Sequence, residues 1–282
     1  QYGALLFRNF TKFSSYDLEN LISTISGESL EYKERSSPRS SVAGNIYTST
    51  EYPAEQAIPL HCENSYQETW PMHIFFHCVT PASVGGETPI ADTRRVFNRI
   101  NPHIRQRFIE NKVMYIRNFY DFLGLPWQTV FQTEDKAQVE AYCTTYGINF
   151  EWQGEGHLKT SVVREPVLKH PQSHELVWFN HAMFFHISTL EPEIKEGLLM
   201  AFQPDELPAN SFYGDGTQIE DSVAEELRNC YQQEVVLVPW QKGDTLMLDN
   251  MLVAHGRQPY SGVRQILVGM ASANTQNLIK QL

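Results

Sequence analysis

The chain has 282 residues, of which 41% are hydrophobic and 20% are charged, and its formal net charge is -11 with a pI near 5.4. This apolar content is enough to bury a large core, which excludes a globally disordered chain. The acidic balance and the lack of a Lys/Arg cluster exclude a typical nucleic-acid binder and argue against an anionic membrane surface as a partner.

The four cysteines are far apart in the sequence and form no C-x-x-C pair. This pattern predicts reduced, mostly buried thiols in a cytoplasmic protein rather than a zinc ribbon or a disulfide framework. No apolar run approaches the roughly 20 residues of a membrane-spanning helix. Because the chain begins with Gln, we expect that some N-terminal residues precede it.

In the first half of the chain, we predict a strand at 3–10 and a helix at 14–27 that begins at Ser and ends at Gly. A polar loop is predicted at 34–45, followed by an apolar strand at 72–79. The GGE at 85–87 is predicted to interrupt the extended structure that follows this strand. Helices are predicted at 91–100 and 103–111, a strand at 112–120, and a helix with a Gly stop at 133–147.

The second half contains short β-like runs at 148–153, 157–170 and 175–180, then helices at 191–203 and 220–233. It ends with predicted strands at 235–240, 244–255 and 264–273. This order predicts a mostly β protein with helical insertions (α+β), built as an antiparallel sandwich or barrel in a single domain, 1–282. We find no G-x-G-x-x-G or P-loop pattern.

The stretch IPLHCENSY, residues 58–66, places His61 and Glu63 two positions apart next to a predicted strand. In a strand, residues i and i+2 point to the same side, so the two side chains would aim at one point. An isolated H-x-E is more often structural than metal-binding. His255, at the end of a second apolar strand, would complete a 2-His-1-carboxylate facial triad, which suits Fe(II) and leaves coordination positions open.

Arg264 follows His255 by nine positions, at the start of another predicted strand. A 2-oxo dicarboxylate that chelates the metal through its oxo-acid end leaves its distal carboxylate nearby, and Arg is the side chain best suited to hold a carboxylate through two hydrogen bonds. Thr88, in the segment GGETPIAD, is the candidate hydroxyl partner of Arg264.

Five segments together resemble the TauD/TfdA superfamily of Fe(II)/2-oxoglutarate-dependent oxygenases, and most of all its SyrP-like members from natural-product pathways. They are HCENSY, PASVGGETPIADTRRV, HPQSHELVWFN, FYGDGTQIED and GDTLMLDNMLVAHGRQPYSGVR, and the resemblance runs from about residue 40 to residue 271. It implies that His61, Glu63 and His255 are catalytic iron ligands. It also implies that Thr88 and Arg264 bind 2-oxoglutarate, that O2 is the second co-substrate, and that the fold is a double-stranded β-helix (a jelly-roll, cupin-like barrel).

Two departures from the family pattern narrow the expected reaction. Taurine oxidisers carry a second Arg where this chain has Val268, which argues against taurine, and they mostly carry Asp where it has Glu63. Halogenases carry a small residue at that position, so Glu63 favours hydroxylation. We therefore expect hydroxylation of an unactivated C–H of an amino acid or amino-acid-derived metabolite, free, carrier-bound or in a peptide, with release of succinate and CO2. Desaturation and ring closure remain open.

Predicted substrate contacts are Asn45 and Tyr47, upstream of the H-x-E, with Arg117 for a substrate carboxylate and Asn180. The expected partner is a small molecule, free or presented on a carrier protein, and a homo-oligomer is left open. The alternatives are a cupin-like metal-binding protein without turnover and a zinc hydrolase, neither of which needs Thr88 paired with Arg264. The pairs His170/His174 and His181/His186 lack the strand spacing of a second metal site, whereas His73 and His77 share a strand face and are expected to be core histidines.

Overall fold

The longest strands form an antiparallel six-stranded sheet in the computed structural model, which describes residues 2–9, 15–31, 40–50, 52–154 and 156–276. The order in this sheet is β1 (Ala4–Phe7), β15 (Thr245–Asp249), β5 (Thr69–Thr80), β18 (Gln265–Thr275), β3 (Ile46–Thr48) and β2 (Ser41–Ala43). Strand β5 pairs along its length with β15 and β18 and is almost entirely buried, which explains its nearly continuous apolar sequence.

A second antiparallel sheet has four strands in the order β14 (Val236–Val238), β7 (Thr88–Asp92), β16 (Val253–Arg257) and β4 (Ile58–His61). The ring of Phe76 on β5 lies 5.1 Å from the ring of His255 on β16, so the two sheets face each other at this point. The predicted mostly β architecture with helical insertions is confirmed.

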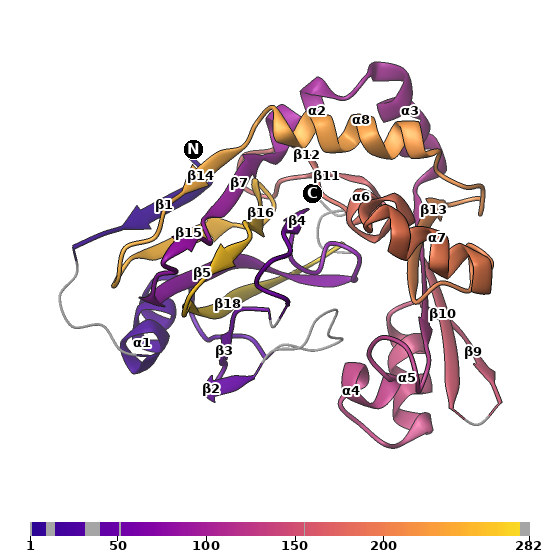
Figure 1. Cartoon of the computed structure of the whole chain (residues 1–282), viewed down its shortest axis with the longest axis horizontal. Coiled ribbons are helices and arrows are strands. Elements are labelled where there is room, and N and C mark those ends of the chain that lie inside the picture. The colour runs from indigo at the N-terminus through magenta and orange to yellow at the C-terminus, as the bar shows by residue number, and fades with distance from the viewer. Residues whose placement is uncertain (1, 10–14, 32–39, 51, 155, 277–282) are drawn as a thin grey trace.

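A third sheet, which also has four strands, lies beside the first two (Figure 1). Its strands are β13 (Ala209–Tyr213), β8 (Val113–Phe119), β10 (His157–Arg164) and β9 (Asn149–Gln153). Two short ladders complete the sheets: β11 (Val167–Lys169) with β12 (Leu176–Trp178), and β6 (Val84–Gly85) with β17 (Tyr260–Ser261).

The helices are α1 (Ser15–Ser26), α2 (Thr93–Arg99), α3 (Pro102–Asn111), α4 (Trp127–Phe131), α5 (Lys136–Thr145), α6 (Ala182–Phe185), α7 (Pro192–Ala201) and α8 (Asp221–Gln232), with a 3-10 turn at Ile187–Thr189. Helix α2 begins where the Asp92 side chain accepts the N–H groups of Arg94 and Arg95. Helix α1 packs Leu18 and Ile22 onto the six-stranded sheet. No helix in the described ranges has the length and apolar character needed to cross a membrane.

Three local predictions differ from the structure. The run 244–255, predicted as one strand, divides at Asn250 into β15 and β16, which belong to different sheets. The run 157–170 breaks at Glu165–Pro166 because proline cannot donate to a strand ladder. Within the predicted loop 34–45, residues 41–43 form β2, whereas 34–39 lie outside the described residues, as does residue 10 of the predicted first strand.

Candidate metal centre and co-substrate pocket

Strands β4 and β16 bring the two predicted imidazole ligands together. His61 and His255 are directly paired across the ladder, and their ring centroids are 4.5 Å apart. Glu63 approaches from the chain that follows β4, and its Oε2 lies 3.8 Å from Nε2 of His255. One ligand atom from each of the three residues lies within 4.8 Å of the others, so a single metal ion can bridge them.

The local geometry of the H-x-E differs from the expected strand. Strand β4 ends at His61, and Glu63 lies in a turn that follows it. The Ser65 N–H donates to the carbonyl of Cys62 in this turn, and Asn64 has a φ of 57°, in the left-handed region. The two side chains still converge, but through a turn and not through strand alternation.

The donor set fits a divalent iron. Nδ1 of His61 lies 2.9 Å from the carbonyl oxygen of Pro59, so Nδ1 carries the proton and Nε2 carries the lone pair that faces the cluster. Glu63 and His255 are 2% and 4% exposed, which keeps bulk water away from the centre. Two imidazole nitrogens and one carboxylate oxygen make up the facial triad that leaves positions open on Fe(II).

The side chain of Asn250, in the connection between β15 and β16, holds the backbone of Glu63 in place. Its Oδ1 accepts the N–H of Glu63, and its Nδ2 donates to the carbonyls of Glu63 and Pro71, each at 2.8 Å. The side chain is fully buried. The predicted strand is therefore interrupted at the residue whose side chain holds the turn of Glu63, the proposed carboxylate ligand.

Gly256 allows β4 to come close to β16 next to His255. A Cβ at this position would lie 2.5 Å from the carbonyl oxygen of Ile58 and 3.2 Å from the carbonyl carbon of Pro59, which are both backbone atoms. Any side chain here would force the two strands apart, and with them the two imidazoles.

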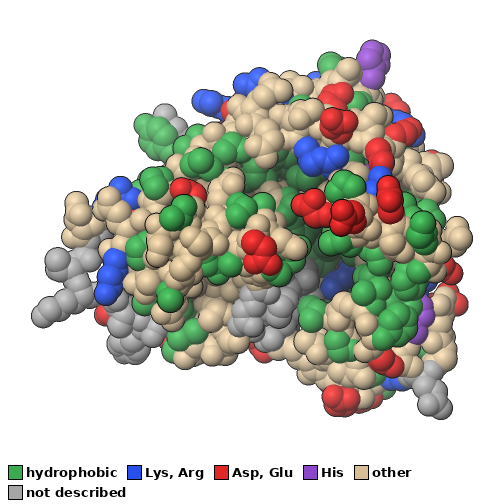
Figure 2. Space-filling view, in the orientation of Figure 1, with side chains coloured by type: hydrophobic (Ala, Val, Ile, Leu, Met, Phe, Trp, Pro, Cys, Tyr) green, Lys and Arg blue, Asp and Glu red, His purple; other side chains and the backbone are tan. Residues whose placement is uncertain are grey.

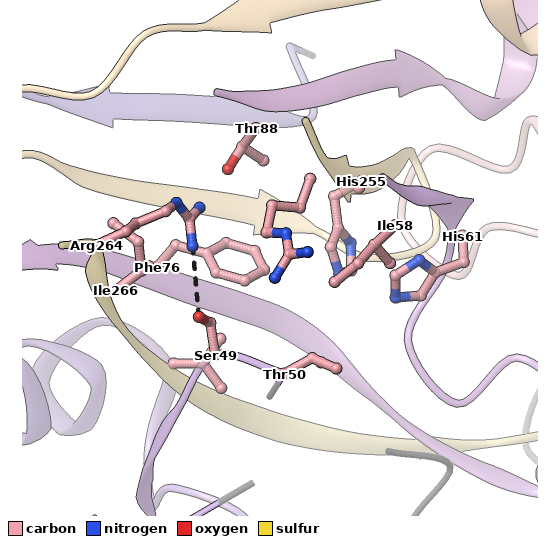
Figure 3. Close-up of a pocket in the computed structure, with 12 residues that line it drawn as sticks. Ser49, Thr50, Ile58, His61, Phe76, Thr88, His255, Arg264 and Ile266 are labelled. Carbon is pink, nitrogen blue, oxygen red and sulfur yellow. Dashed lines mark hydrogen bonds between the residues drawn. The ribbon is translucent and has the colours of Figure 1, made fainter. Parts of the chain in front are cut away.

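The predicted co-substrate residues line the same pocket as the imidazoles (Figure 3). Thr88 comes from β7 of the smaller sheet and Arg264 from the chain just before β18, and both lie close to His61 and His255 around one cavity. The volume of this cavity is about 30 Å³.

Two guanidinium groups give this pocket its charge. Arg264 donates from Nε to the carbonyl of Gly86 and from Nη1 to Oγ of Ser49, at 3.1 and 3.5 Å. Burial, and then the nearby charge of Arg257, lowers the pKa of Arg264 to about 10. Two like charges in a desolvated pocket repel, and a dianion removes that repulsion. Arg257 itself is held in place by the carbonyls of Tyr52, Pro53 and Gln56.

Trp240 orients the hydroxyl of Thr88. The indole Nε1–H donates to Thr88 Oγ1 at 3.1 Å. Because an indole only donates, the threonine oxygen acts here as an acceptor, and its own O–H can then donate to another acceptor in the pocket.

Comparison with known proteins identifies the family. The family model "Taurine catabolism dioxygenase TauD, TfdA family" matches residues 1–271. The chain belongs to the TauD/TfdA family. Among curated TauD/TfdA relatives, the dapdiamide synthesis protein DdaC of Enterobacter agglomerans is 41% identical over 268 residues, which cover 95% of this chain and 82% of DdaC. A clavaminate synthase-like protein of Arabidopsis thaliana is 30% identical and covers 95% and 81% of the two chains.

Solved structures agree on the fold. PvcB, described as an Fe, alpha-ketoglutarate dependent oxygenase from an isonitrile synthetic pathway, superposes with a TM-score of 0.52 at 16% identity, covering 95% of this chain and 74% of its own. AAD-2, in complex with Mn(II) and N-oxalylglycine, gives a TM-score of 0.56 at 13% identity, covering 98% and 84%. As a TauD/TfdA member, the protein is an Fe(II)- and 2-oxoglutarate-dependent oxygenase.

The four predicted substrate residues of this TauD/TfdA protein lie in different surroundings. The Asn45 amide donates to the carbonyl of Ser29, and Tyr47 is buried in the core on β3. Asn180 uses both ends of its amide next to α6, donating to the carbonyl of Pro166 and accepting the N–H of Ala182. Arg117 is buried on β8 and lines a second cavity. Their assignment to substrate stays a prediction.

Several other histidines are held by protein groups. His77 contacts Thr245, His170 pairs with Asp249, and both nitrogens of His186 have partners, Ser188 and the carbonyl of Ile219. His181 lies closest to the centre, with its ring 5.8 Å from that of His61 and its Nδ1 2.6 Å from Ser65 Oγ. Burial lowers the pKa of His181 well below its ordinary value. All four cysteines are buried thiols, as predicted.

Sequence reasoning missed Asn250, Trp240 and Gly256. Each acts by hydrogen bonding or by close backbone approach to a residue far away in the sequence, and none belongs to a residue type that signals metal chemistry. The only available signal was position, because all three stand within 15 residues of His255, and Asn250 and Gly256 lie in the segment 243–264 that carries the resemblance.

Proposed function

We propose that this enzyme holds iron on His61, Glu63 and His255, and 2-oxoglutarate on Thr88 and Arg264, to hydroxylate an unactivated C–H bond of an amino acid or amino-acid-derived metabolite. The observation that carries the proposal is one cavity lined by both imidazoles and by both co-substrate residues. Succinate and CO2 are the expected co-products.

The bound iron, with O2 and 2-oxoglutarate, would supply the oxidant for C–H cleavage. The residues of the chain position the co-substrate and exclude water. Arg264 and the hydroxyl of Thr88 hold the distal carboxylate of the co-substrate and so fix its orientation. Phe76, Ile266 and Val268 give the pocket an apolar wall that limits the access of water.

We further propose that the two facing antiparallel sheets form the double-stranded β-helix of this class. The order of the larger sheet supports this proposal, since β5 lies between β15 and β18, which come from a distant part of the chain. The site lies between this sheet and the smaller one, where such a barrel would have its interior.

The proposed substrate class is supported by the names of two similar proteins and by the residues at positions 268 and 63. DdaC is named for dapdiamide synthesis, and PvcB for an isonitrile pathway. Val268 lines the pocket with an apolar side chain where a sulfonate would need a cation, which speaks against taurine. Glu63 supplies the carboxylate ligand and so speaks against halogenation. Desaturation and ring closure start from the same C–H cleavage and are the alternative outcomes.

Anaerobic titration with Fe(II) and 2-oxoglutarate tests the proposal. We expect a weak visible charge-transfer band in the wild type and none in His255→Ala. A cupin-like protein without turnover would show no band and no succinate release with any amino-acid-derived compound. A zinc hydrolase would regain activity when zinc is added after chelation, without any dependence on O2.

A further inference from the structure

A second cavity, of about 290 Å³, lies next to helix α6 and is lined by Arg117. The other lining residues come from β8 itself, from the β8–α4 connection, from α6 and from the chain around the start of β13. Figure 2 shows the surface hollowed between the part of the molecule that carries the two facing sheets and the part that carries β8, β9 and β10. Arg117 is the charged side chain among the described lining residues, and Phe119, Leu125, Phe185 and Pro208 make the wall largely apolar.

The guanidinium of Arg117 is held in place by aromatic rings. Tyr115, Arg117 and Phe119 alternate along β8 and therefore share one face of the strand. The guanidinium carbon lies 4.8 Å from the ring centroid of Phe119 and 5.5 Å from that of Tyr66, and the residue is only 9% exposed. Asn118 points to the opposite face, where its amide donates to the carbonyls of Asp205 and Leu207.

Helix α6 connects this cavity to the metal centre. Phe184 packs on the ring of His61 at 4.7 Å, whereas its neighbour Phe185 lines the cavity of Arg117. The ring of Tyr66, which faces Arg117, also lies 5.1 Å from Phe185 and 5.0 Å from His181. One cluster of rings therefore contacts both a proposed metal ligand and the buried guanidinium.

The geometry points to a carboxylate-binding subsite at Arg117, which receives a free carboxylate of the substrate while another part of the same molecule reaches the metal centre. This inference rests on the proposed function and narrows its substrate class. A guanidinium in a mostly apolar wall favours an anion, and its planar fork matches a carboxylate through two parallel hydrogen bonds. The cavity volume is close to the lower end of small-ligand sites, roughly 300 Å³.

A carboxylate subsite distinguishes a free substrate from one that is bound to a carrier protein, two forms between which the sequence does not choose. A carboxyl group that is bound to a carrier protein as a thioester has no negative charge for Arg117 to bind. The subsite therefore requires that the carboxyl group at this end be free. Because the ring cluster lies between the guanidinium and the metal ligands, the carbon that is oxidised is not the one next to this carboxylate.

Affinity selection with matched ligands tests the subsite. The full chain, loaded anaerobically with Fe(II) and 2-oxoglutarate, is incubated with a library of N-acetyl dipeptides as free acids, mixed with the same compounds as methyl esters. We expect retained compounds to be acids, with affinities about tenfold or more above those of their esters, as a charge-assisted pair provides. Arg117→Met should remove this preference. Arg105→Met is the matched control, since Arg105 also stacks over a phenylalanine ring, at 4.4 Å from Phe97, but on helix α3.

Equal retention of acids and esters by the wild type would overturn the subsite, as would retention of neither form, and this comparison needs no variant to fold. An unchanged acid preference in Arg117→Met would overturn it as well. The charge-transfer band of the wild-type complex reports separately on the proposed function. If the band were absent but acids were retained through Arg117, the metal proposal would fail while the subsite stood.

Discussion

Replacement of Asn250 by alanine removes the three side-chain hydrogen bonds that join the β15–β16 connection to the backbone of Glu63 and Pro71. The change leaves one buried N–H, that of Glu63, and two carbonyls, those of Glu63 and Pro71, without their partner. At roughly 1 kcal/mol for each buried hydrogen bond that is lost, the free energy of unfolding should fall by about 3 kcal/mol. This is a large share of the roughly 5–15 kcal/mol that a typical domain has. Urea unfolding of the metal-free protein measures the loss.

The same substitution should also weaken metal binding, because the turn that presents the Glu63 carboxylate loses its support. Loss of such an outer contact typically costs about 10–100-fold in metal affinity. Anaerobic titration with Co(II), followed by its visible absorption, measures this affinity without any need for turnover.

Asn250→Asp is the matched comparison. Aspartate keeps an oxygen that accepts the Glu63 N–H, but its second oxygen faces the two carbonyls in place of a donor, so it should be at least as destabilising as alanine. If Asn250→Ala lost less than about 1 kcal/mol of stability and bound Co(II) like the wild type, the assignment of Asn250 as a positioning residue would be wrong.

Four further results are expected. His255→Ala should reduce the Fe(II) bound per chain to near zero by metal analysis, and a retained stoichiometric ion would contradict the ligand set. Arg264→Ala should weaken 2-oxoglutarate binding about tenfold or more while Fe(II) binding persists; an unaltered affinity for 2-oxoglutarate would remove Arg264 from the clamp. Trp240→Phe keeps the ring but loses the donor to Thr88, and should weaken 2-oxoglutarate roughly two- to tenfold. Trp152→Phe is its control, because that indole donates to Glu140 on a helix away from the pocket, and equal effects in both variants would refute the role of Trp240. Finally, burial lowers the pKa of His73, His77, His181 and His186, so below a pH of about 6.5 the unfolded chain takes up protons that the folded chain does not. The free energy of unfolding should therefore fall between pH 7 and pH 5 in urea titrations, and a flat profile would contradict this.

The predicted helices and most strands agree with the structure, because their signals are local. Helix α8 shows this well: Val223, Leu227 and Cys230 fall on one buried face at helical spacing. The division of residues 244–255 could not be predicted in the same way. The run is apolar throughout, and only its hydrogen bonds to distant backbone, made by Asn250, show that it turns from one sheet to the other.

The local geometry predicted for the three proposed metal ligands is only partly correct. The H-x-E spacing predicted a shared strand face, whereas Glu63 lies in a turn after the strand. Residue type and the resemblance to a family identified the three side chains, and the structure places them together. The surroundings of Asn45 and Arg117 depend on tertiary packing, so the sequence offered no basis for ranking them.

The close contact at Gly256 has a consequence for engineering this enzyme. His61 and His255 stand on directly paired strands whose separation is set by backbone atoms on both sides, so neither imidazole can be moved without the other. The carboxylate is different, because its turn is attached through side-chain hydrogen bonds that mutagenesis can redesign. Libraries meant to retune the reactivity of the centre should therefore keep residue 256 as glycine and vary the segment that follows His61.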